Sequence, residues 1–568
     1  MRSRDFAGAR HVARVFPAAG NDADVVAIFF SMLLAMIFRA LTLLCCAGAL
    51  WGQGVTFDRL LHPDREPQNW LSYSRSIDGQ RYSPLTQITP ANVKNLELQW
   101  VWQARSLEKF EASPIVVDGI VYTIQAPNDV VALDAVTGRP FWTFPYTPAP
   151  EARPCCGRVN RGLAILGDAL FMGTLDAHVI AIDAKNGKKL WDTTIASAAD
   201  RYVITHAPLI VKDKVIVGTA GGDGPTRGQI VALDTKTGQE AWRFYTIPGP
   251  GEPGHETWSG DSWKTGGAAV WNIGAYDPEQ NLTYWGIGNP APDTNGDARL
   301  GDNLYSDCVV ALDADTGKLR WYYQFTPHDE FDYDSTQVPV LADIQYQGRA
   351  RKVLMWANRN GNWYVLDRVT GQFLMGKPFT KVTWMTGFDE RGRPMRTPIS
   401  ADNDHPTLIM PHGLGGTNWY PPSYSPHTGW FYIPGWENSG AMVTKTNGFG
   451  RSLGNTPMAQ VNLQPNNKTE NEGYGIVRAF DPKTGEQKWE FKMNDITWAG
   501  VLTTASDLLF SGGREGYFYA LDARNGKLLW HASLGGQVNS GPISYAINGR
   551  QYIAVNAGTA MFVYALRQ

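Results

Sequence analysis

Cysteine is scarce in this chain, and the two signs of charge nearly cancel. Only 5 of the 568 residues are cysteines, and no Cys-x-x-Cys-His sequence occurs, so we expect no haem c attached to the chain. Paired Cys-x-x-Cys blocks are absent as well, which argues against a zinc site. With 51 basic and 54 acidic residues the net charge is −3, which argues against nucleic acid or an anionic membrane as the main partner.

A long uninterrupted hydrophobic run is also missing. The apolar stretch over residues 25–50 contains Arg39, which argues against the alternative of a transmembrane anchor. From Met36, a short basic start, the apolar residues 40–50 and the small residues 47–49 match a signal peptide with its cleavage site. We therefore expect an exported, periplasmic protein, in which a disulfide can persist.

The chain divides into a leader and one large domain. We interpret residues 1–53 as a misassigned start plus the signal peptide, with Met36 or Met32 as the true initiator. Residues 54–568 are long enough for several domains or for one large repeat architecture, and no second domain is evident in them.

A tryptophan-containing repeat runs along this domain. It follows the pattern Ala-Leu-Asp-x-x-Thr-Gly-x-x-x-Trp, with six copies between Ala132 and Trp530 and two degenerate ones. In each copy a strand ends in Ala-Leu-Asp, the Asp and Thr side chains stabilise a turn, and the glycine supplies a positive φ. The turn glycines of the eight copies are Gly138, Gly187, Gly238, Gly317, Gly371, Gly429, Gly485 and Gly526.

Eight such units predict an all-β fold, an eight-bladed β-propeller. Units of about 40–60 residues, each of several strands, stack radially, and the repeated tryptophans dock between neighbouring units. The strand-like run from Met561 is expected to close the propeller against the N-terminal blade. Two longer intervals, from Asp234 to Asp313 and from Thr370 to Ser425, are expected to carry loops on one face that build the site.

The adjacent residues Cys155 and Cys156 form the most informative short motif. Neighbouring Cα atoms lie about 3.8 Å apart, below the usual range for a disulfide, so a bond between these two closes a strained ring. Such strain tends to be kept where a rigid surface must meet a ligand. The alternative is two small buried thiols that merely lie side by side.

The repeat and the vicinal cysteines together resemble the quinoprotein alcohol dehydrogenases, which use pyrroloquinoline quinone (PQQ), over about residues 57–568. The resemblance implies that Cys155 and Cys156 form a disulfide against one face of PQQ and that Trp271 stacks on the other face. It also implies further contacts to the cofactor from Glu111, Arg161, Thr205, Arg359, Asn418, Trp419 and Trp498.

The same resemblance implies a metal ion beside the cofactor. Asn289 and Asp332 match a metal-binding asparagine and the catalytic aspartate, and Asp223 stands where the family commonly has glutamate. Asp334, two residues after the catalytic position, is typical of lanthanide-dependent members, and several carboxylates suit a hard, highly charged cation. The alternatives are calcium as the metal, Asp223 as a turn residue only, and a solvated acidic loop around Asp334.

The sequence thus predicts oxidation of a primary alcohol to an aldehyde with PQQ and one Ca²⁺ or lanthanide ion. Asp332 is the predicted general base, Arg359 stabilises negative charge on the quinone oxygen, and the metal polarises the quinone carbonyl. Electrons are expected to pass to a separate cytochrome c. The alternatives are a non-catalytic propeller of the outer-membrane assembly type, which has no use for these residues, and a quinoprotein sugar dehydrogenase, whose membrane-bound members have several N-terminal helices.

Overall fold

Short antiparallel strands make up nearly all of the regular structure. The computed structural model describes residues 54–399, 405, 407–443 and 473–567, so the predicted start and signal peptide lie outside the described residues. The described part contains one short α-helix, α2 (Phe57–Leu61), and no helix in it is long and apolar enough to cross a membrane. The fold of residues Gly54–Gln568 is therefore built from sheets.

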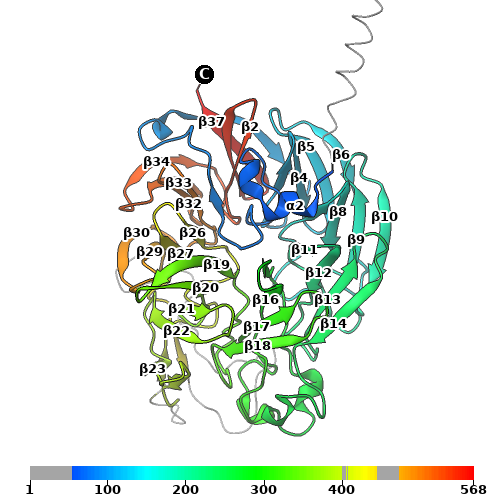
Figure 1. Cartoon of the computed structure of the whole chain (residues 1–568), viewed down its shortest axis with the longest axis vertical. Helices are drawn as coiled ribbons and strands as arrows, with labels where there is room; N and C mark the ends of the chain where they lie inside the picture. Colours follow the sequence, from blue (N-terminus) through cyan, green and yellow to red (C-terminus); the bar gives the residue numbers. More distant parts are fainter. Residues whose placement is uncertain (1–53, 400–404, 406, 444–472, 568) are drawn as a thin grey trace, which may run out of the picture. The chain divides into compact units, whose positions relative to one another are not determined.

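Eight sheets follow one another around a ring (Figure 1). The first five consist of β3 (Ile115–Val117), β4 (Ile120–Gln125), β5 (Asp129–Asp134) and β6 (Pro140–Phe144); β7 (Ala164–Leu166), β8 (Ala169–Gly173), β9 (His178–Asp183) and β10 (Lys189–Thr194); β11 (Leu209–Val211), β12 (Lys214–Gly218), β13 (Gln229–Asp234) and β14 (Glu240–Tyr245); β15 (Ala275–Asp277), β16 (Leu282–Gly286), β17 (Cys308–Asp313) and β18 (Leu319–Gln324); β19 (Val340–Tyr346), β20 (Arg349–Ala357), β21 (Asn362–Asp367) and β22 (Phe373–Pro378).

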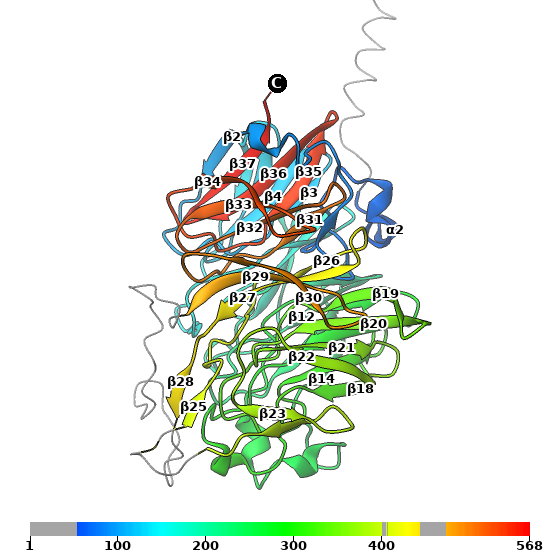
Figure 2. The same cartoon turned by 90° about the vertical axis from the view of Figure 1, so that its left-hand side faces the viewer.

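The remaining three sheets complete the ring, and Figure 2 shows them from the side. They consist of β26 (Ser423–Ser425), β27 (Trp430–Glu437), β29 (Tyr474–Phe480) and β30 (Gln487–Lys492); β31 (Leu502–Thr504), β32 (Leu508–Gly512), β33 (Tyr517–Asp522) and β34 (Leu528–Ser533), with β1 (Tyr82–Ser83) added parallel to β31; and β35 (Ile543–Ile547), β36 (Arg550–Ala557), β37 (Ala560–Leu566) and β2 (Leu96–Gln103). The predicted eight-bladed, all-β propeller is confirmed.

The last sheet joins the two ends of the domain. β37 pairs antiparallel with β2, in a register that runs from Leu96 opposite Leu566 to Gln103 opposite Ala560 (Figure 1). The expectation that the C-terminal strand closes the propeller is therefore confirmed. Because backbone hydrogen bonds join β2, in the first part of the domain, to β37 at its end, the ring of sheets is closed.

The repeat turn has the predicted geometry. The Asp134 carboxylate accepts the backbone N–H groups of Val136 (3.0 Å) and Thr137 (2.8 Å), and also the Thr137 hydroxyl (2.9 Å). The turn between the third and fourth strands of a blade contains a positive-φ glycine in seven blades. These glycines are Gly138, Gly187, Gly238, Gly317, Gly371, Gly485 and Gly526, with φ between 68° and 77°.

Most of these glycines receive a tryptophan from the preceding blade. The Trp142 indole lies against Gly187, and its Nε1–H donates to the Ala184 carbonyl (3.2 Å). The same two kinds of contact join Trp100, Trp191, Trp242, Trp321 and Trp489 to the blade that follows each of them. At Gly485 the nearest side chains are Met375 and Lys377, so this interface packs without a tryptophan.

Gly429 does not mark a blade of its own. It lies between β26 and β27, the first two strands of the blade whose repeat turn carries Gly485. A Ser-x-x-Thr-Gly turn can join any two antiparallel neighbours, because its side chains stabilise the turn whatever strands flank it. The prediction of eight blades is right, but the eighth blade is the closing sheet and not the Gly429 copy.

Replacing Gly317 by alanine is expected to destabilise the propeller more than the same change at Gly429. The two glycines have similar φ values, 68° and 72°, so the cost of a left-handed alanine, about 1–2 kcal/mol, applies to both. A Cβ at Gly317 would overlap the Trp242 ring, whereas a Cβ at Gly429 meets no atom within 4 Å. The clash should add about 1–3 kcal/mol, measured as a larger fall in thermal unfolding temperature. Equal shifts for the two variants would show that tight docking of the indole is not required.

The long intervals do carry extra loops. Residues 246–274 hold two short helical turns, η3 (His255–Thr257) and η4 (Ser262–Thr265), and residues 287–307 hold η5 (Gly296–Arg299). Between β22 and β26 the chain forms β23 (Met385–Phe388), β24 (Pro394–Arg396) and β25 (Thr407–Ile409), and β25 pairs with β28 (Ala441–Val443). These insertions supply part of the site described below.

Candidate active site

The candidate site lies at the edge of the ring where the chain enters the innermost strands. Because the first two strands of a blade are antiparallel, the start of the first and the end of the second lie at the same edge. Loops at these positions in different blades therefore meet. They carry Glu111 before β3, Thr205 before β11 and Asp332 before β19, and Asp223 after β12, Asn289 after β16 and Arg359 after β20.

One cavity at this edge brings together every side chain that the sequence analysis assigned to the site. It encloses about 1120 Å³, part of which is open to solvent. The predicted residues that line it are Glu111, Cys155, Cys156, Arg161, Thr205, Asp223, Trp271, Asn289, Asp332, Asp334, Arg359, Asn418, Trp419 and Trp498. Sequence reasoning missed other lining residues, among them Lys109, Leu414, Tyr420 and Trp436.

A buried ion pair and two indoles form one wall. Arg161 pairs with Glu111 at 2.9 Å, and both side chains are almost inaccessible to solvent. Burial raises the pKa of Glu111, and the Arg161 charge opposes that shift. The Arg161 guanidinium also lies 5.2 Å from the Trp271 ring centre and 4.9 Å from the Trp419 ring centre. Cation–π contact with two rings fixes the direction of this side chain.

Thr205 ties this wall to the neighbouring loop. Its hydroxyl accepts a hydrogen bond from Arg161 at 3.2 Å and donates one to the Trp271 carbonyl at 3.2 Å. Both contacts are within the protein, so Thr205 positions the groups around it.

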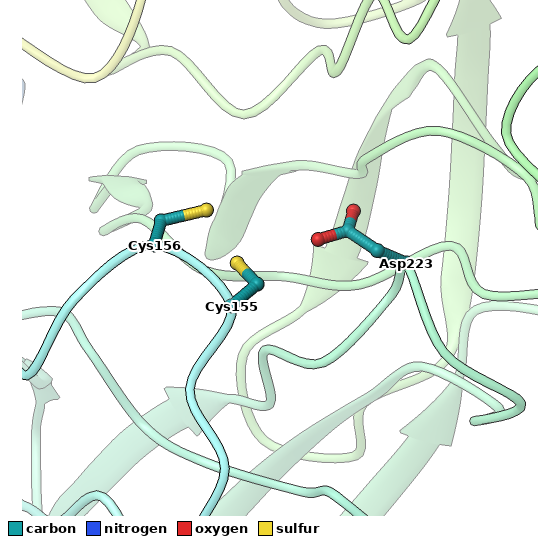
Figure 3. A group of neighbouring side chains, drawn as sticks. All are labelled: Cys155, Cys156 and Asp223. Atoms are coloured by element: carbon teal, nitrogen blue, oxygen red, sulfur yellow. The ribbon is translucent and has the colours of Figure 1, made fainter. Parts of the chain in front are cut away.

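The vicinal cysteines stand beside Asp223 (Figure 3). The two Sγ atoms and a carboxylate oxygen of Asp223 lie within 4.8 Å of one another. Cys155 and Cys156 are free thiols in the structure, so the disulfide is not shown and stays a prediction. Asp223 lines the same cavity as Asp334, and burial, followed by the negative charge of Asp334, raises the pKa of Asp223.

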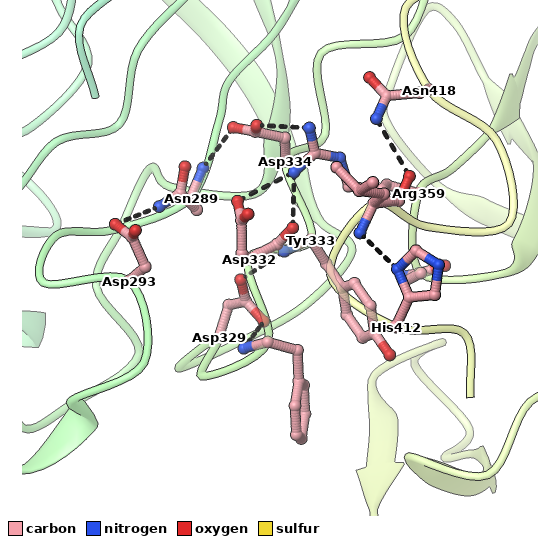
Figure 4. Close-up of polar contacts among 12 residues, drawn as sticks. Asn289, Asp293, Asp329, Asp332, Tyr333, Asp334, Arg359, His412 and Asn418 are labelled. Atoms are coloured by element: carbon pink, nitrogen blue, oxygen red, sulfur yellow. Dashed lines mark hydrogen bonds and ion pairs between the residues drawn. The ribbon is translucent and has the colours of Figure 1, made fainter. Parts of the chain in front are cut away.

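Arg359 links the two aspartates of the predicted catalytic segment (Figure 4). One guanidinium nitrogen contacts Asp332 Oδ1 at 2.9 Å, and another contacts Asp334 Oδ2 at 3.1 Å. The Asp334 side chain is 7% exposed, which contradicts the alternative of a solvated acidic loop. The Asp332 side chain is 35% exposed, and it lines the cavity, where a substrate can reach it.

The loop around Asp332 is a turn and not an extended segment. Asp332 has φ of 63°, a left-handed conformation that is uncommon for a residue with a side chain. The carboxylate of Asp329 holds this turn, since it accepts the N–H groups of Phe331 (2.9 Å) and Tyr333 (2.7 Å). The turn, and not strand alternation, brings Asp332 and Asp334 to the same cavity.

Asn289 lines the same cavity, and two carboxylates accept hydrogen bonds from its nitrogens. Its backbone N–H donates to Asp334 Oδ1 at 2.9 Å, and its Nδ2 donates to Asp293 Oδ1 at 2.9 Å (Figure 4). The sequence analysis did not include Asp293, although a carboxylate four residues after a predicted metal ligand could have been recognised as a candidate for the same site. Burial, and then Asp223 and Asp334, raise the pKa of Asp293 to about 7.

Two further aromatic side chains, Trp436 and Trp498, line the cavity beside Lys109. The Lys109 ammonium lies 3.6 Å from the ring centre of Trp498, which in turn stacks on Trp436 at 6.5 Å. Asn418 lines the cavity, but its amide nitrogen donates to the Leu414 carbonyl at 3.0 Å. The Asn418 amide therefore stabilises its own loop.

The donor set fits the groups that the sequence predicted. Asp223, Asn289, Asp332 and Asp334 supply only oxygen atoms, which hard cations prefer. Buried Nε atoms of Arg161 and Arg359 have no hydrogen-bond partner within the described residues, and two cationic side chains suit an anionic, planar quinone. The site therefore matches a metal ion next to such a cofactor.

Comparisons with known proteins agree with this chemistry. The family described as "Glucose/ethanol/alcohol dehydrogenase, beta-propeller domain" matches residues 70–383. The quinoprotein alcohol dehydrogenase PedH of Pseudomonas putida is 36% identical, over 92% of this chain and 92% of its own length. The lanthanide-dependent methanol dehydrogenase of Methylacidiphilum fumariolicum is 36% identical, over 88% of this chain and 86% of its own length.

A solved structure and a second family complete the comparison. The quinohemoprotein alcohol dehydrogenase ADHIIG of Pseudomonas putida superposes with a TM-score of 0.83 at 36% identity, over 90% of this chain and 82% of that one. The family described as "Outer membrane protein assembly factor BamB" matches residues 473–564 alone. Because named dehydrogenases match nearly the whole chain, the alternative of a non-catalytic propeller is wrong.

Proposed function

The chain belongs to the family of PQQ-dependent alcohol dehydrogenases, and we propose that it oxidises a primary alcohol to an aldehyde with one hard metal ion beside PQQ. The observation that carries this proposal is the gathering of all the predicted cofactor, metal and catalytic side chains in one cavity. Exposed Leu414 and the Trp419 and Trp436 side chains give that cavity apolar walls, which suit the carbon chain of an alcohol.

PQQ, when bound, supplies the oxidant that takes two electrons from the alcohol. Trp271 on one side and the Cys155–Cys156 pair on the other would hold it, and the disulfide belongs to this proposal. The buried pair of Glu111 and Arg161 would orient it, because its geometry is already set by contacts with the protein. A preorganised wall loses little conformational entropy when the cofactor binds.

Asp332 is placed to accept the proton of the alcohol. Its side chain lines the cavity, and an ionised carboxylate there can take up the proton of a hydroxyl group bound beside it. Arg359 lies 2.9 Å from Asp332 Oδ1 and keeps the carboxylate in one orientation. The same cation is near enough to stabilise negative charge that develops in the cavity.

Asp223, Asn289, Asp332 and Asp334 would hold the metal, and we favour a lanthanide over calcium. Three carboxylates beside one amide oxygen form a strongly anionic set, which gains more from a trivalent than from a divalent ion. The relative from Methylacidiphilum fumariolicum is named a lanthanide-dependent enzyme, which supports this choice.

A separate cytochrome c is the proposed electron acceptor. The relative ADHIIG is named a quinohemoprotein, whereas the sequence printed here has no Cys-x-x-Cys-His for a covalent haem. Reconstituted enzyme should therefore reduce a soluble c-type cytochrome. Export to the periplasm is part of the same proposal, and sequencing the N-terminus of protein from a periplasmic extract tests it.

Reconstitution is the experiment that tests the function. The mature protein is incubated with PQQ and either La³⁺ or Ca²⁺, and dye-linked oxidation of methanol, ethanol, longer primary alcohols and glucose is measured. We expect alcohol oxidation that requires PQQ and is faster with La³⁺. Activity with Ca²⁺ alone would contradict the assignment of a lanthanide. Oxidation of glucose alone would make the protein a sugar dehydrogenase. Failure to bind PQQ with either ion would contradict the proposal as a whole.

A further inference from the structure

The carboxylate of Asp293 lies beside the predicted metal ligand Asn289 and has no part in the site proposed so far. Asp293 Oδ1 accepts a hydrogen bond from Asn289 Nδ2 at 2.9 Å, and the same nitrogen lies 3.3 Å from the Pro290 carbonyl (Figure 4). The backbone N–H of Asn289 donates to Asp334 at 2.9 Å. The nitrogens of Asn289 are therefore engaged by the protein, and its side-chain oxygen is left for a cation.

This contact selects the orientation of the amide. A primary amide has one end that can bind a cation and one end that cannot. An ionised carboxylate only accepts hydrogen bonds, so Asp293 attracts Nδ2 and repels Oδ1 of Asn289. A rotated amide would place its oxygen against the Asp293 carboxylate and turn its N–H groups toward the metal site.

Asp293 is itself held in place by a buried arginine. Arg299 is fully buried, and its guanidinium donates to the carbonyls of Pro292 (3.1 Å) and Asp293 (2.9 Å) and to Asn303 Oδ1 (2.9 Å). The main chain that carries the Asp293 carboxylate is thus anchored from outside the cavity. A rigid supporting group of this kind can fix the geometry of a metal ligand.

Asp293 also adds charge to the site. Its Oδ1 is one hydrogen bond away from Asn289 Nδ2, and the backbone N–H of Asn289 donates to Asp334, so the Asp293 carboxylate lies close to the predicted metal ligands. Coulombic attraction scales with the charge of the ion, so an added carboxylate at this place favours a trivalent over a divalent cation.

We propose that Asp293 is a positioning and specificity-determining residue: it holds Asn289 with the amide oxygen toward the metal and shifts the preference of the site from divalent to trivalent cations. This inference rests on the proposed function, because it concerns the metal of that same site. It assigns two separable roles, one to the hydrogen bond and one to the charge.

Two variants separate these roles. Asp293→Asn keeps an acceptor for Asn289 but removes the charge, and Asp293→Ala removes both. Binding of Tb³⁺ to the PQQ-loaded protein is followed by its luminescence, and Ca²⁺ affinity is obtained by competition. Asp261→Asn is the control, since this exposed aspartate pairs with Lys264 in the separate insertion of residues 246–274. Circular dichroism and thermal unfolding confirm that each variant folds.

We expect Asp293→Asn to weaken Tb³⁺ binding about 10-fold and to change Ca²⁺ binding by less than about 3-fold. Asp293→Ala should weaken the binding of both ions by about 10–100-fold, the usual range for groups that support a metal ligand. Equal affinities in wild type and both variants, or equal losses for both ions in Asp293→Asn, would overturn the inference while leaving the proposed function intact. A wild-type protein that binds neither ion in the presence of PQQ would overturn the proposed function itself, and this inference with it.

Discussion

Replacement of Asp332 by asparagine is expected to lower kcat for alcohol oxidation by about 10²–10⁴-fold, the usual contribution of a general base. The amide cannot take up the alcohol proton at neutral pH, while its size and its place in the left-handed turn are preserved. The turn is held by Asp329, whose bonds to Phe331 and Tyr333 do not involve the Asp332 side chain. The loss should therefore concern the chemical step and not the fold.

The measurement is dye-linked turnover of the variant after saturation with PQQ and metal, with the cofactor content determined from its absorbance. Asp302→Asn is a suitable control, because Asp302 forms an ion pair with Arg393 at 2.7 Å outside the cavity lining. Near-normal rates in Asp332→Asn with PQQ bound would falsify the assignment of the base. A variant that loses PQQ or metal would instead show that Asp332 acts mainly as a ligand.

Replacement of Asp334 by asparagine is expected to weaken La³⁺ binding by about 100-fold or more and to remove La³⁺-dependent activity. The variant keeps the shape of the side chain but lacks the charge that faces the cation and pairs with Arg359 at 3.1 Å. Coulombic attraction scales with the charge of the ion, so the loss should be smaller for Ca²⁺ than for La³⁺.

Isothermal titration of the PQQ-loaded protein with La³⁺ and with Ca²⁺ measures this difference, and the Asp302→Asn variant again serves as the reference. Removal of metal from the wild type with a chelator should abolish activity, and adding La³⁺ back should restore it. If Asp334→Asn binds both ions as the wild type does, Asp334 serves only to anchor Arg359 and the backbone N–H of Asn289.

Much of the fold could be predicted because its determinants act over a few residues. The Asp, Thr and Gly of the repeat stabilise one turn, and the tryptophan four residues after the glycine marks the outer strand, so strands and turns follow from the printed sequence. The assignment of Gly429 failed because turn chemistry does not say which two strands it joins. Strand pairing, which places Gly429 and Gly485 in the same blade, was needed to decide this.

The sequence by itself determined the all-β repeat and, through the motifs that carry the family resemblance, the residue types of the site. Only the tertiary structure decided which side chains share a cavity and how each is held. Lys109 lies over Trp498, and Arg359 holds Asp332 and Asp334, through contacts between blades or loops that no local pattern encodes. The reason is physical: a turn is stabilised by its immediate neighbours, whereas a functional site forms where ring closure brings together loops that are far apart along the chain.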